Sequence, residues 1–228
     1  MPCAFDIETS RVCVDADDNP HTIMYIWQCQ LGLDITIIGR TWDEWLNFTG
    51  AISDYLQANS GPQGDWFLCM YVHNLAHEFQ YLSGVLDFSP GDVFASKPRR
   101  VLKCDNRAIE YRCSMRHSNL SLDAWGKQLG APHAKLTGAL DYSKVRYPWT
   151  SLTSTELAYC INDVRCIVEC LLIEMNRDGD DLYTLPLTRT GYVRRMAREA
   201  CINGALNGSS AFCVVGLIPN VAGSVSGR

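Results

Sequence analysis

The sequence of 228 residues predicts an α/β domain built on a mixed sheet that is flanked by helices. β-rich runs dominate the first 40 residues, strand-like and helical segments then interleave, and the clearest helix follows late, over residues 153–175. Strands followed by interleaved helices and strands are typical of a sheet with helices packed on it. A hydrophobic content of 47% with 20% charged residues is that of a globular chain.

The chain is expected to open with strands at residues 1–10, 21–33 and 34–40. The last two of these runs follow a turn at Asn19-Pro20 and are expected to pair as a hairpin. Thr41 and Glu44 then form a capping box, in which each side chain satisfies a free N–H group at the start of a helix. This box predicts an amphipathic helix over about residues 42–58.

The middle of the chain alternates between strands and helices. The continuous apolar run 66–73 predicts a buried strand, and a helix is expected to follow from Asn74. Two more strands are expected at residues 99–105 and 108–115. Residues 120–130 predict a short helix, which ends at its final glycine.

The clearest helix begins at Thr153, with Glu156 as its capping partner. Its apolar residues recur at helical spacing. These residues are Leu157, Ile161, Val164, Ile167 or Val168, Leu171 and Met175. Residues 185–204 predict a basic helix behind a proline. Residues 205–228 are rich in Gly, Ser, Ala and Val without periodicity, so a weakly ordered tail is expected there.

Charge is distributed unevenly along the chain. The whole chain carries 20 Lys or Arg against 25 Asp or Glu, which gives a net charge of −5. Residues 96–146 alone carry eleven Lys or Arg against four Asp or Glu. A basic segment between acidic ones suits a protein that holds both an anionic polymer and metal cations, although ordinary surface variation produces the same pattern.

Membrane, disulfide and zinc chemistry are disfavoured by the sequence. No apolar run approaches the ~20 residues of a membrane helix, and Met1 opens no signal peptide, so no membrane partner is expected. The 11 cysteines are an odd number and include no CxxC pair. They are therefore expected to be reduced thiols and not a structural zinc site.

Carboxylates stand at three notable places. Asp6 and Glu8 are two apart on the first strand, so both side chains point to one face, where a divalent cation such as Mg²⁺ or Mn²⁺ would relieve their repulsion. Glu78 follows a buried strand, at a junction from which it can reach the end of a neighbouring strand. Tyr159 and Asp163 are four apart and share a helix face. Taken alone, each of these motifs is equally well explained by ordinary polar residues on the surface or in a buried polar pair.

Together these three motifs resemble the DEDD-type 3′–5′ exonucleases of the Tyr-bearing subclass. The motif order extends the likeness over about residues 3–196, to the N-terminal exonuclease domain of family B DNA polymerases, with the phage and protein-primed (organellar and viral) branch as the nearest group. The segments that carry it are AFDIETS, MYIWQ, YVHNLAHEFQYL, RCSMRHSNLSL, KLTGALDYSKVR, ELAYCINDV and PLTRTGYVRR. The resemblance implies a ribonuclease H-like fold and a proofreading role in DNA replication.

The resemblance also implies a set of site residues. Two divalent metal ions, Mg²⁺ or Mn²⁺, would be bound by four carboxylates, which are Asp6, Glu8, Glu78 and Asp163. Such ions hold the attacking and leaving oxygens of a phosphodiester. Tyr159 would position the attacking water, and Lys135 is the candidate for a lysine that neutralises phosphate charge in the transition state. A single-stranded DNA 3′ end would contact Thr9, Asn74, His77, Ser114, Met115 and Tyr142.

The chain departs from the family pattern in three respects. Glu78 stands where many relatives have Asp, and His77 replaces the usual aromatic residue at a stacking position. The polymerase motifs are absent, namely a DxxSLYP-like strand, a Lys-bearing fingers helix and a YxDTD segment. We therefore expect a metal-dependent 3′–5′ exodeoxyribonuclease with no polymerase activity of its own, located in the cytoplasm (of the host cell, if phage-encoded).

Two alternatives stay open. The chain could be an inactive remnant that still binds nucleic acid, or the first piece of an interrupted polymerase that works only with a separate polymerase polypeptide. The expected organisation is an exonuclease domain over residues 1–184, the basic helix 185–204 as the start of a link to a polymerase region, and the tail 205–228. In the second alternative the basic helix would dock to the polymerase polypeptide. The sequence leaves the choice between DNA and RNA ends undecided.

Overall fold

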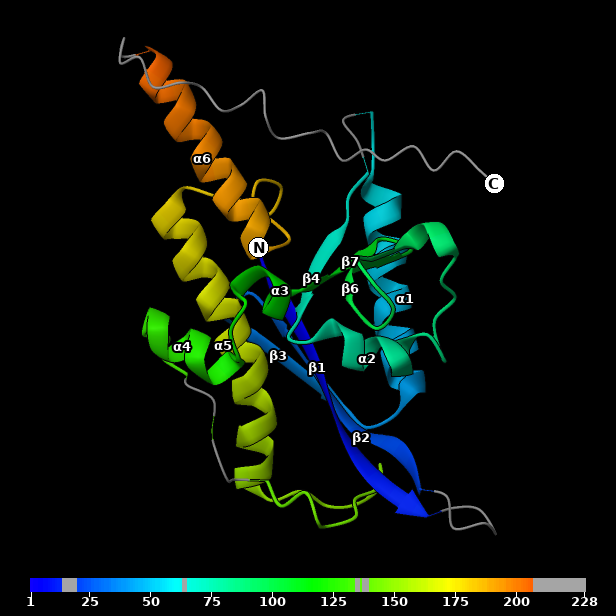
Figure 1. The fold of residues 1–228 in the computed structure, drawn as a ribbon. Coiled ribbons are helices and arrows are strands. Elements are labelled where there is room, and N and C mark those ends of the chain that lie inside the picture. Colours follow the sequence, from blue (N-terminus) through cyan, green and yellow to red (C-terminus); the bar gives the residue numbers. More distant parts are fainter. Residues whose placement is uncertain (14–19, 63–64, 134–135, 137–139, 207–228) are drawn as a thin grey trace, which may run out of the picture.

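A computed structural model describes residues 1–13, 20–62, 65–133, 136 and 140–206 (Figure 1). The strands of the described residues are β1 (Cys3–Cys13), β2 (Pro20–Leu31), β3 (Ile35–Gly39), β4 (Leu68–Val72), β5 (Val93–Ala95), β6 (Val101–Asn106) and β7 (Ile109–Cys113). The helices are α1 (Trp42–Asn59), α2 (Leu75–Leu82), α3 (Ser114–Ser118), α4 (Leu122–Leu129), α5 (Ser154–Asp178) and α6 (Arg189–Leu206), with a 3₁₀ turn at Pro90–Asp92.

All seven strands of the described residues form one mixed sheet in the order β3-β2-β1-β4-β7-β6-β5. β1 pairs antiparallel with β2 and parallel with β4, and β4 pairs parallel with β7. Helices α4 and α5 lie on one side of this sheet, and α1 and α2 lie on the other (Figure 1). The molecule therefore has three layers, with β1 near the middle of the sheet.

The alternation of β1 assigns its residues to the two faces of the sheet. Phe5 stacks on Trp45 of α1, with ring centroids 4.1 Å apart. Ala4 instead belongs to the cluster of buried residues that includes Val164 of α5. Asp6 shares the face of Ala4, and Glu8 follows two residues later, so both carboxylates lie on the α5 side.

The aromatic core on the α1 side fixes the turn between β3 and α1. Trp27 of β2 packs edge-on against Trp45, and its Nε1 donates a hydrogen bond of 2.9 Å to the carbonyl of Thr41. A Cβ atom on Gly39 would come within 2.2 Å of the Trp27 ring. The indole therefore occupies the space that any larger residue at position 39 would need.

Most predicted elements are confirmed, including both capping boxes at Thr41 and Thr153. The first strand is longer than expected, because β2 pairs with it as far as Cys13. The strand expected to end at residue 115 stops at Cys113, and helix α3 begins at once. Strand β5 was not predicted, because it is only three residues long and too short to show a periodicity.

The C-terminal part also differs in its boundaries. Helix α6 begins four residues into the segment predicted as a basic helix and ends at Leu206, two residues into the predicted tail. Residues 207–228, the rest of that tail, lie outside the described residues. In the part of the chain that the structure describes, no helix combines the length and apolar character needed to cross a membrane.

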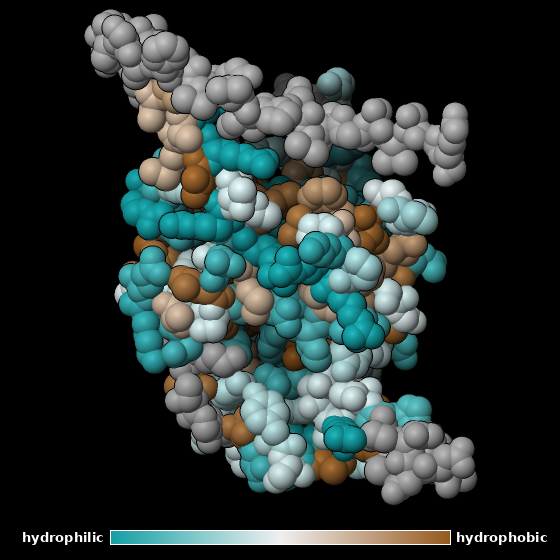
Figure 2. Space-filling model, viewed as in Figure 1, coloured by the Kyte–Doolittle hydropathy of each residue, from teal (hydrophilic) through white to brown (hydrophobic). Residues whose placement is uncertain are grey.

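The surface and the thiols agree with a globular chain. Hydrophilic residues cover most of the face seen in Figure 2, with hydrophobic residues scattered among them. Within the described residues nine cysteines are free, and eight of these are buried. Cys160, Cys166 and Cys170 of α5 are among them, so they act as small apolar residues between α5 and the sheet.

Candidate functional site

Three of the four predicted metal ligands lie together. Ligand atoms of Asp6, Glu8 and Asp163 are all within 4.8 Å of one another. Asp6 is half-buried, and the other two side chains are buried. Because β1 and α5 are packed face to face, two segments far apart in the sequence supply this cluster.

A β-bulge stands directly beside the cluster. The pairing of β1 with β2 shifts register between Glu8, opposite Ile26, and Thr9, opposite Met24. Bulges re-aim side chains and are over-represented next to active sites. Here the extra residue is Tyr25 of β2, which stands opposite the step from Glu8 to Thr9, and Thr9, predicted to contact DNA, is half-buried just beyond this point.

Gln28 is a site residue that the sequence analysis missed. It lies opposite Asp6 on β2, and its Nε2 donates a hydrogen bond of 2.7 Å to Oδ2 of Asp6. Its Oε1 and the hydroxyl of Tyr25 are buried without a hydrogen-bond partner among the described residues. The only signal in the sequence was an amide among the apolar residues of a predicted strand, and Gln30 in the same strand gives the same signal. Both amides are fully buried, where polar groups are usually hydrogen-bonded.

Glu78 lies outside this group of three carboxylates, but its pKa is affected by the charge of Glu8. Its side chain is buried on α2, and its Oε2 has no hydrogen-bond partner among the described residues. Burial raises the pKa of Glu78 to about 8, and the negative charge of Glu8 adds to the rise. The chain reaches α2 through Asn74, which holds a left-handed backbone (φ 73°) and so makes the sharp turn after β4.

Tyr159 lies one helical turn before Asp163 and is buried. Its hydroxyl is 2.9 Å from that of Tyr142, whose ring is 70% exposed. Burial raises the pKa of Tyr159, and the hydrogen bond to Tyr142 and the charges of Asp163 and Glu8 raise it further. Tyr159 therefore keeps its proton at neutral pH and can donate a hydrogen bond beside the carboxylates.

The remaining residues predicted to contact DNA or phosphate differ in burial and in their neighbours. His77 is half-buried and packs edge-on against Tyr81, and burial lowers its pKa. Ser114 is fully buried, with its hydroxyl 3.1 Å from Nδ1 of His73. Met115 packs against the buried cluster on the α1 side. Lys135 lies outside the described residues, so its role stays a prediction.

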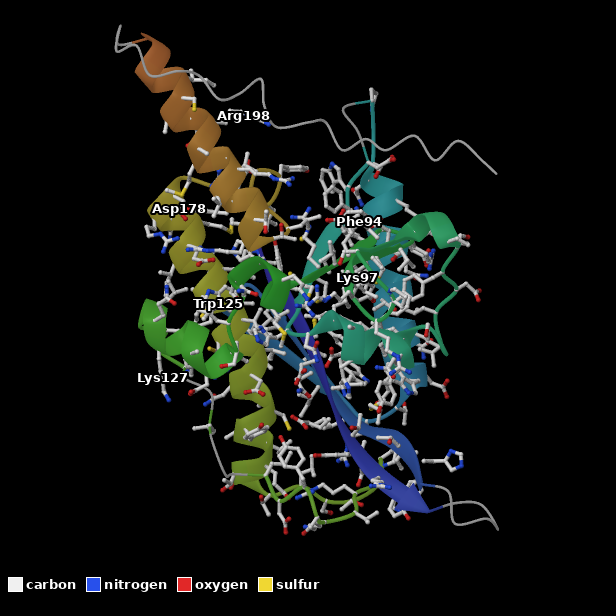
Figure 3. All side chains as sticks on the ribbon, in the orientation of Figure 1. Phe94, Lys97, Trp125, Lys127, Asp178 and Arg198 are labelled. Atoms are coloured by element: carbon white, nitrogen blue, oxygen red, sulfur yellow. The ribbon has the colours of Figure 1, made fainter. Side chains whose placement is uncertain are left out.

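Much of the charge in the basic segment 96–146 is matched inside the fold. Arg112 and Lys103 both pair with Glu110, and Arg146 pairs with Glu156 at 2.5 Å. Lys127 pairs with a neighbour on α4, and it lies on the opposite side of α5 from Lys97 (Figure 3). The excess of Lys and Arg in the sequence is therefore not one continuous basic stripe.

The donor set fits a hard divalent cation. It consists of carboxylate oxygens alone, which are the ligands that Mg²⁺ and Mn²⁺ prefer. Neighbouring buried carboxylates repel one another unless a cation balances them. The pKa of Glu78 is raised mainly by burial, and the charge of Glu8 adds a smaller contribution. The cluster can thus bind a metal ion, with Glu78 at its margin.

Comparisons with known proteins agree with this architecture. No family model matches the chain, and no curated protein sequence matches it. Solved structures of Phi29 DNA polymerase match the fold of the chain. Its ternary complex with primer-template DNA and incoming nucleotides has a TM-score of 0.59 at 16% identity, over 92% of this chain and 34% of the polymerase. Its complex with single-stranded DNA has a TM-score of 0.58 at 17% identity, over 92% and 35%.

The fold is shared with a DNA polymerase. The predicted ribonuclease H-like α/β class is thereby confirmed. The chain spans about a third of the length of the solved structures that it matches. At identities of 16–18% the likeness concerns the fold, and the chemistry has to be argued from the residues of this chain.

Proposed function

We propose that this chain is a metal-dependent 3′–5′ exonuclease domain of a family B DNA polymerase, which removes nucleotides from single-stranded DNA 3′ ends in proofreading. The observation that carries the proposal is the cluster of Asp6, Glu8 and Asp163 with the hydroxyl-bearing Tyr159 one turn away. A fold shared with a polymerase that has been solved in complex with single-stranded DNA supports DNA as the ligand.

The residues of the chain divide the work of hydrolysis. Asp6, Glu8, Asp163 and, at the margin, Glu78 would hold two Mg²⁺ or Mn²⁺ ions. When bound, such ions activate water and stabilise the leaving 3′ oxygen. Gln28 orients Asp6 through its 2.7 Å hydrogen bond. Tyr159 donates a hydrogen bond that positions the attacking water, and Tyr142 fixes the Tyr159 hydroxyl and contacts the terminal nucleotide.

The remaining site assignments belong to the same proposal. Thr9, Asn74 and His77 surround the bulge and the β4–α2 junction, where hydroxyl, amide and ring groups can contact sugar, phosphate and base. Ser114, Met115 and Lys135 complete the set expected from the family resemblance. The exonuclease domain would end near residue 184, and α6 would begin the link to a polymerase region.

Degradation of a labelled oligonucleotide tests the proposal. The purified chain is incubated with a 5′-labelled single strand and Mg²⁺, beside Asp6→Asn and Asp163→Asn. We expect a ladder of products shortened from the 3′ end, slowed by roughly 10²-fold or more in both variants because each removes a metal ligand. Asp34→Asn, in the exposed turn between β2 and β3, serves as a matched control with unchanged rate. Equal degradation by all proteins, or none by the wild type, would contradict an active exonuclease.

A further inference from the structure

An exposed aromatic pair lies on the segment that joins the candidate site to α5. The rings of Tyr147 and Trp149 stack with centroids 4.9 Å apart and an interplanar angle of 3°. Trp149 is 79% exposed, so the outer face of its indole is open to solvent. An indole held outward in this way exposes a large apolar surface, and such surfaces often mark sites of interaction.

A buried arginine holds this segment in place. The side chain of Arg146 is 2% exposed, and its Nε and Nη2 donate to Oε1 of Glu156 at 3.0 and 2.5 Å. Its Nη1 donates to the carbonyls of Asp141 and Lys144 at 2.7 and 3.0 Å. Its backbone N–H donates to Oγ of Ser10 on β1 at 2.8 Å. The segment is therefore tied to both β1 and α5.

A second arginine fixes the part that bears the rings. Nη2 of Arg40 donates to the carbonyls of Tyr147 and Thr150 at 3.1 and 2.7 Å, and its Nε donates to the carbonyl of Tyr25 at 2.6 Å. The backbone on both sides of Trp149 is thereby bound to β2. Such pre-organisation lowers the entropy cost when a ligand packs on the rings.

The aromatic pair is within reach of the carboxylate centre. The segment leaves the site at Tyr142, whose hydroxyl is 2.9 Å from that of Tyr159. Seven residues further along, Trp149 lies at most about 25 Å away, because an extended chain spans up to ~3.6 Å per residue. Even a fully stacked strand, at ~3.4 Å per nucleotide, covers that span with roughly seven nucleotides, and a more extended single strand needs fewer. Lys144 lies between them in the sequence; its side chain is half-exposed, with Nζ 3.9 Å from Oε1 of Glu156.

We propose that Tyr147 and Trp149 form a base-stacking platform for single-stranded DNA, on which a nucleobase several positions before the 3′ end packs against the outer face of Trp149. The location of the 3′ end at the carboxylates rests on the proposed exonuclease function. Base–aromatic stacking is sequence-tolerant because every base has a π face, as an enzyme that acts on any 3′ end requires. The patch is small, because the other exposed large apolar residues of this segment are Tyr142 and Val145, and it suits a single base better than a protein surface.

The test measures binding, so that it does not depend on hydrolysis. Fluorescence anisotropy with Ca²⁺ in place of Mg²⁺ compares 5′-labelled oligothymidylates of 4 and 12 nucleotides. Trp149→Ala should weaken binding of the 12-mer by about five- to tenfold, the lower end of the range for one stacked base, and leave the 4-mer unchanged. Trp149→Phe should restore most of the affinity. Trp66→Ala, at another exposed tryptophan just before β4, is the matched control.

Each outcome decides the proposal. Equal affinity of wild type and Trp149→Ala for the 12-mer overturns it, as does an equal loss for both lengths or the absence of any binding by the wild type. If Trp149→Ala instead changes the sedimentation of the protein and not its affinity for DNA, the pair is a protein contact and the proposal fails. A length-dependent loss in a wild-type chain that degrades no DNA would support the platform while overturning the exonuclease. Circular dichroism establishes that each variant is folded.

Discussion

At the scale of single residues, the site combines carboxylates with neutral partners that hold them. Gln28 binds Asp6, and Tyr142 binds Tyr159, so two key side chains are oriented by residues on other elements. Neutral hydrogen-bond donors of this kind orient the ligands of metal sites without adding charge. At the margin of the site the partner is charged instead, because Arg146 fixes a loop through an ion pair with Glu156.

Tyr159→Phe should slow hydrolysis by about 10- to 100-fold with little change in the affinity for DNA, because it removes a hydroxyl that orients water while the ring keeps its packing. Single-turnover hydrolysis and anisotropy measured on the same oligonucleotide separate the two effects. Tyr55→Phe removes an exposed hydroxyl on α1 and should match the wild type in both assays. A loss of affinity equal to the loss of rate would assign Tyr159 to binding.

Glu156→Gln should lower the free energy of unfolding at neutral pH by about 3 kcal/mol, because the buried Arg146 loses its charged partner. The hydrogen bonds that Glu156 accepts from Thr153 and Arg146 lower its pKa to about 2, from ~4.3 in an unfolded chain. The lowered pKa stabilises the fold above about pH 4.3, and this contribution is lost as the pH falls towards 2.

Urea unfolding across this pH range provides the measurement for Glu156. The wild type should lose stability between about pH 4.3 and 2, and the curve of Glu156→Gln should be flatter there. Asp54→Asn removes the exposed partner of Arg107 and should cost less than ~1 kcal/mol. Parallel curves for wild type and Glu156→Gln would show that this carboxylate is not the group responsible.

At the scale of elements, a strand, a helix and an aromatic cluster position the site. The bulge of β2 at Tyr25 stands opposite the step from Glu8 to Thr9, and α5 supplies Tyr159 and Asp163 from a single face. On the opposite side of the sheet, Trp27 and Trp45 anchor α1 to β1 and β2. The face of β1 that bears Phe5 and Ile7, opposite the three carboxylates, is thus the side with the densest aromatic packing.

Gly39→Ala should destabilise the fold by about 2 kcal/mol or more, because the new Cβ would lie 2.2 Å from the buried Trp27 ring, which is itself packed against Trp45. Gly50→Ala should instead stabilise the fold. Its Cβ would meet only Nη1 of Arg107, at 3.7 Å, so the higher helix propensity of alanine should stabilise α1 by up to ~1 kcal/mol. Chemical denaturation of the two variants checks both signs, and equal effects would contradict the packing argument.

At the scale of the whole molecule, three layers create a cluster that no single element contains. β1 supplies two carboxylates, α5 supplies one, and Glu78 approaches from α2 across the end of β4. Unbalanced negative charge at this meeting point opposes folding, and a bound cation relieves it. A metal ion that binds this cluster would therefore stabilise the entire fold.

Addition of Mn²⁺ should raise the melting temperature of the wild type by several degrees, since the ion binds the folded chain and not the unfolded one. Asp163→Asn should show little or no rise, and without metal it should be at least as stable as the wild type because it removes one of the repelling charges. Scanning calorimetry with and without Mn²⁺ provides the measurement. An equal rise in both proteins would indicate binding elsewhere, and no rise in the wild type would favour the inactive remnant.

The class of fold, most element boundaries and three of the residues that meet in the cluster could be predicted from the sequence. Capping boxes at Thr41 and Thr153 and the spacing of Asp6 and Glu8 are local features, so they can be recognised without knowledge of the fold. Only the tertiary structure decided that Asp163 meets the strand pair, that Gln28 supports Asp6, and that Arg146 and Arg40 hold an aromatic pair outward. These are contacts across strands and layers, and the distances they depend on exist only once the chain is packed.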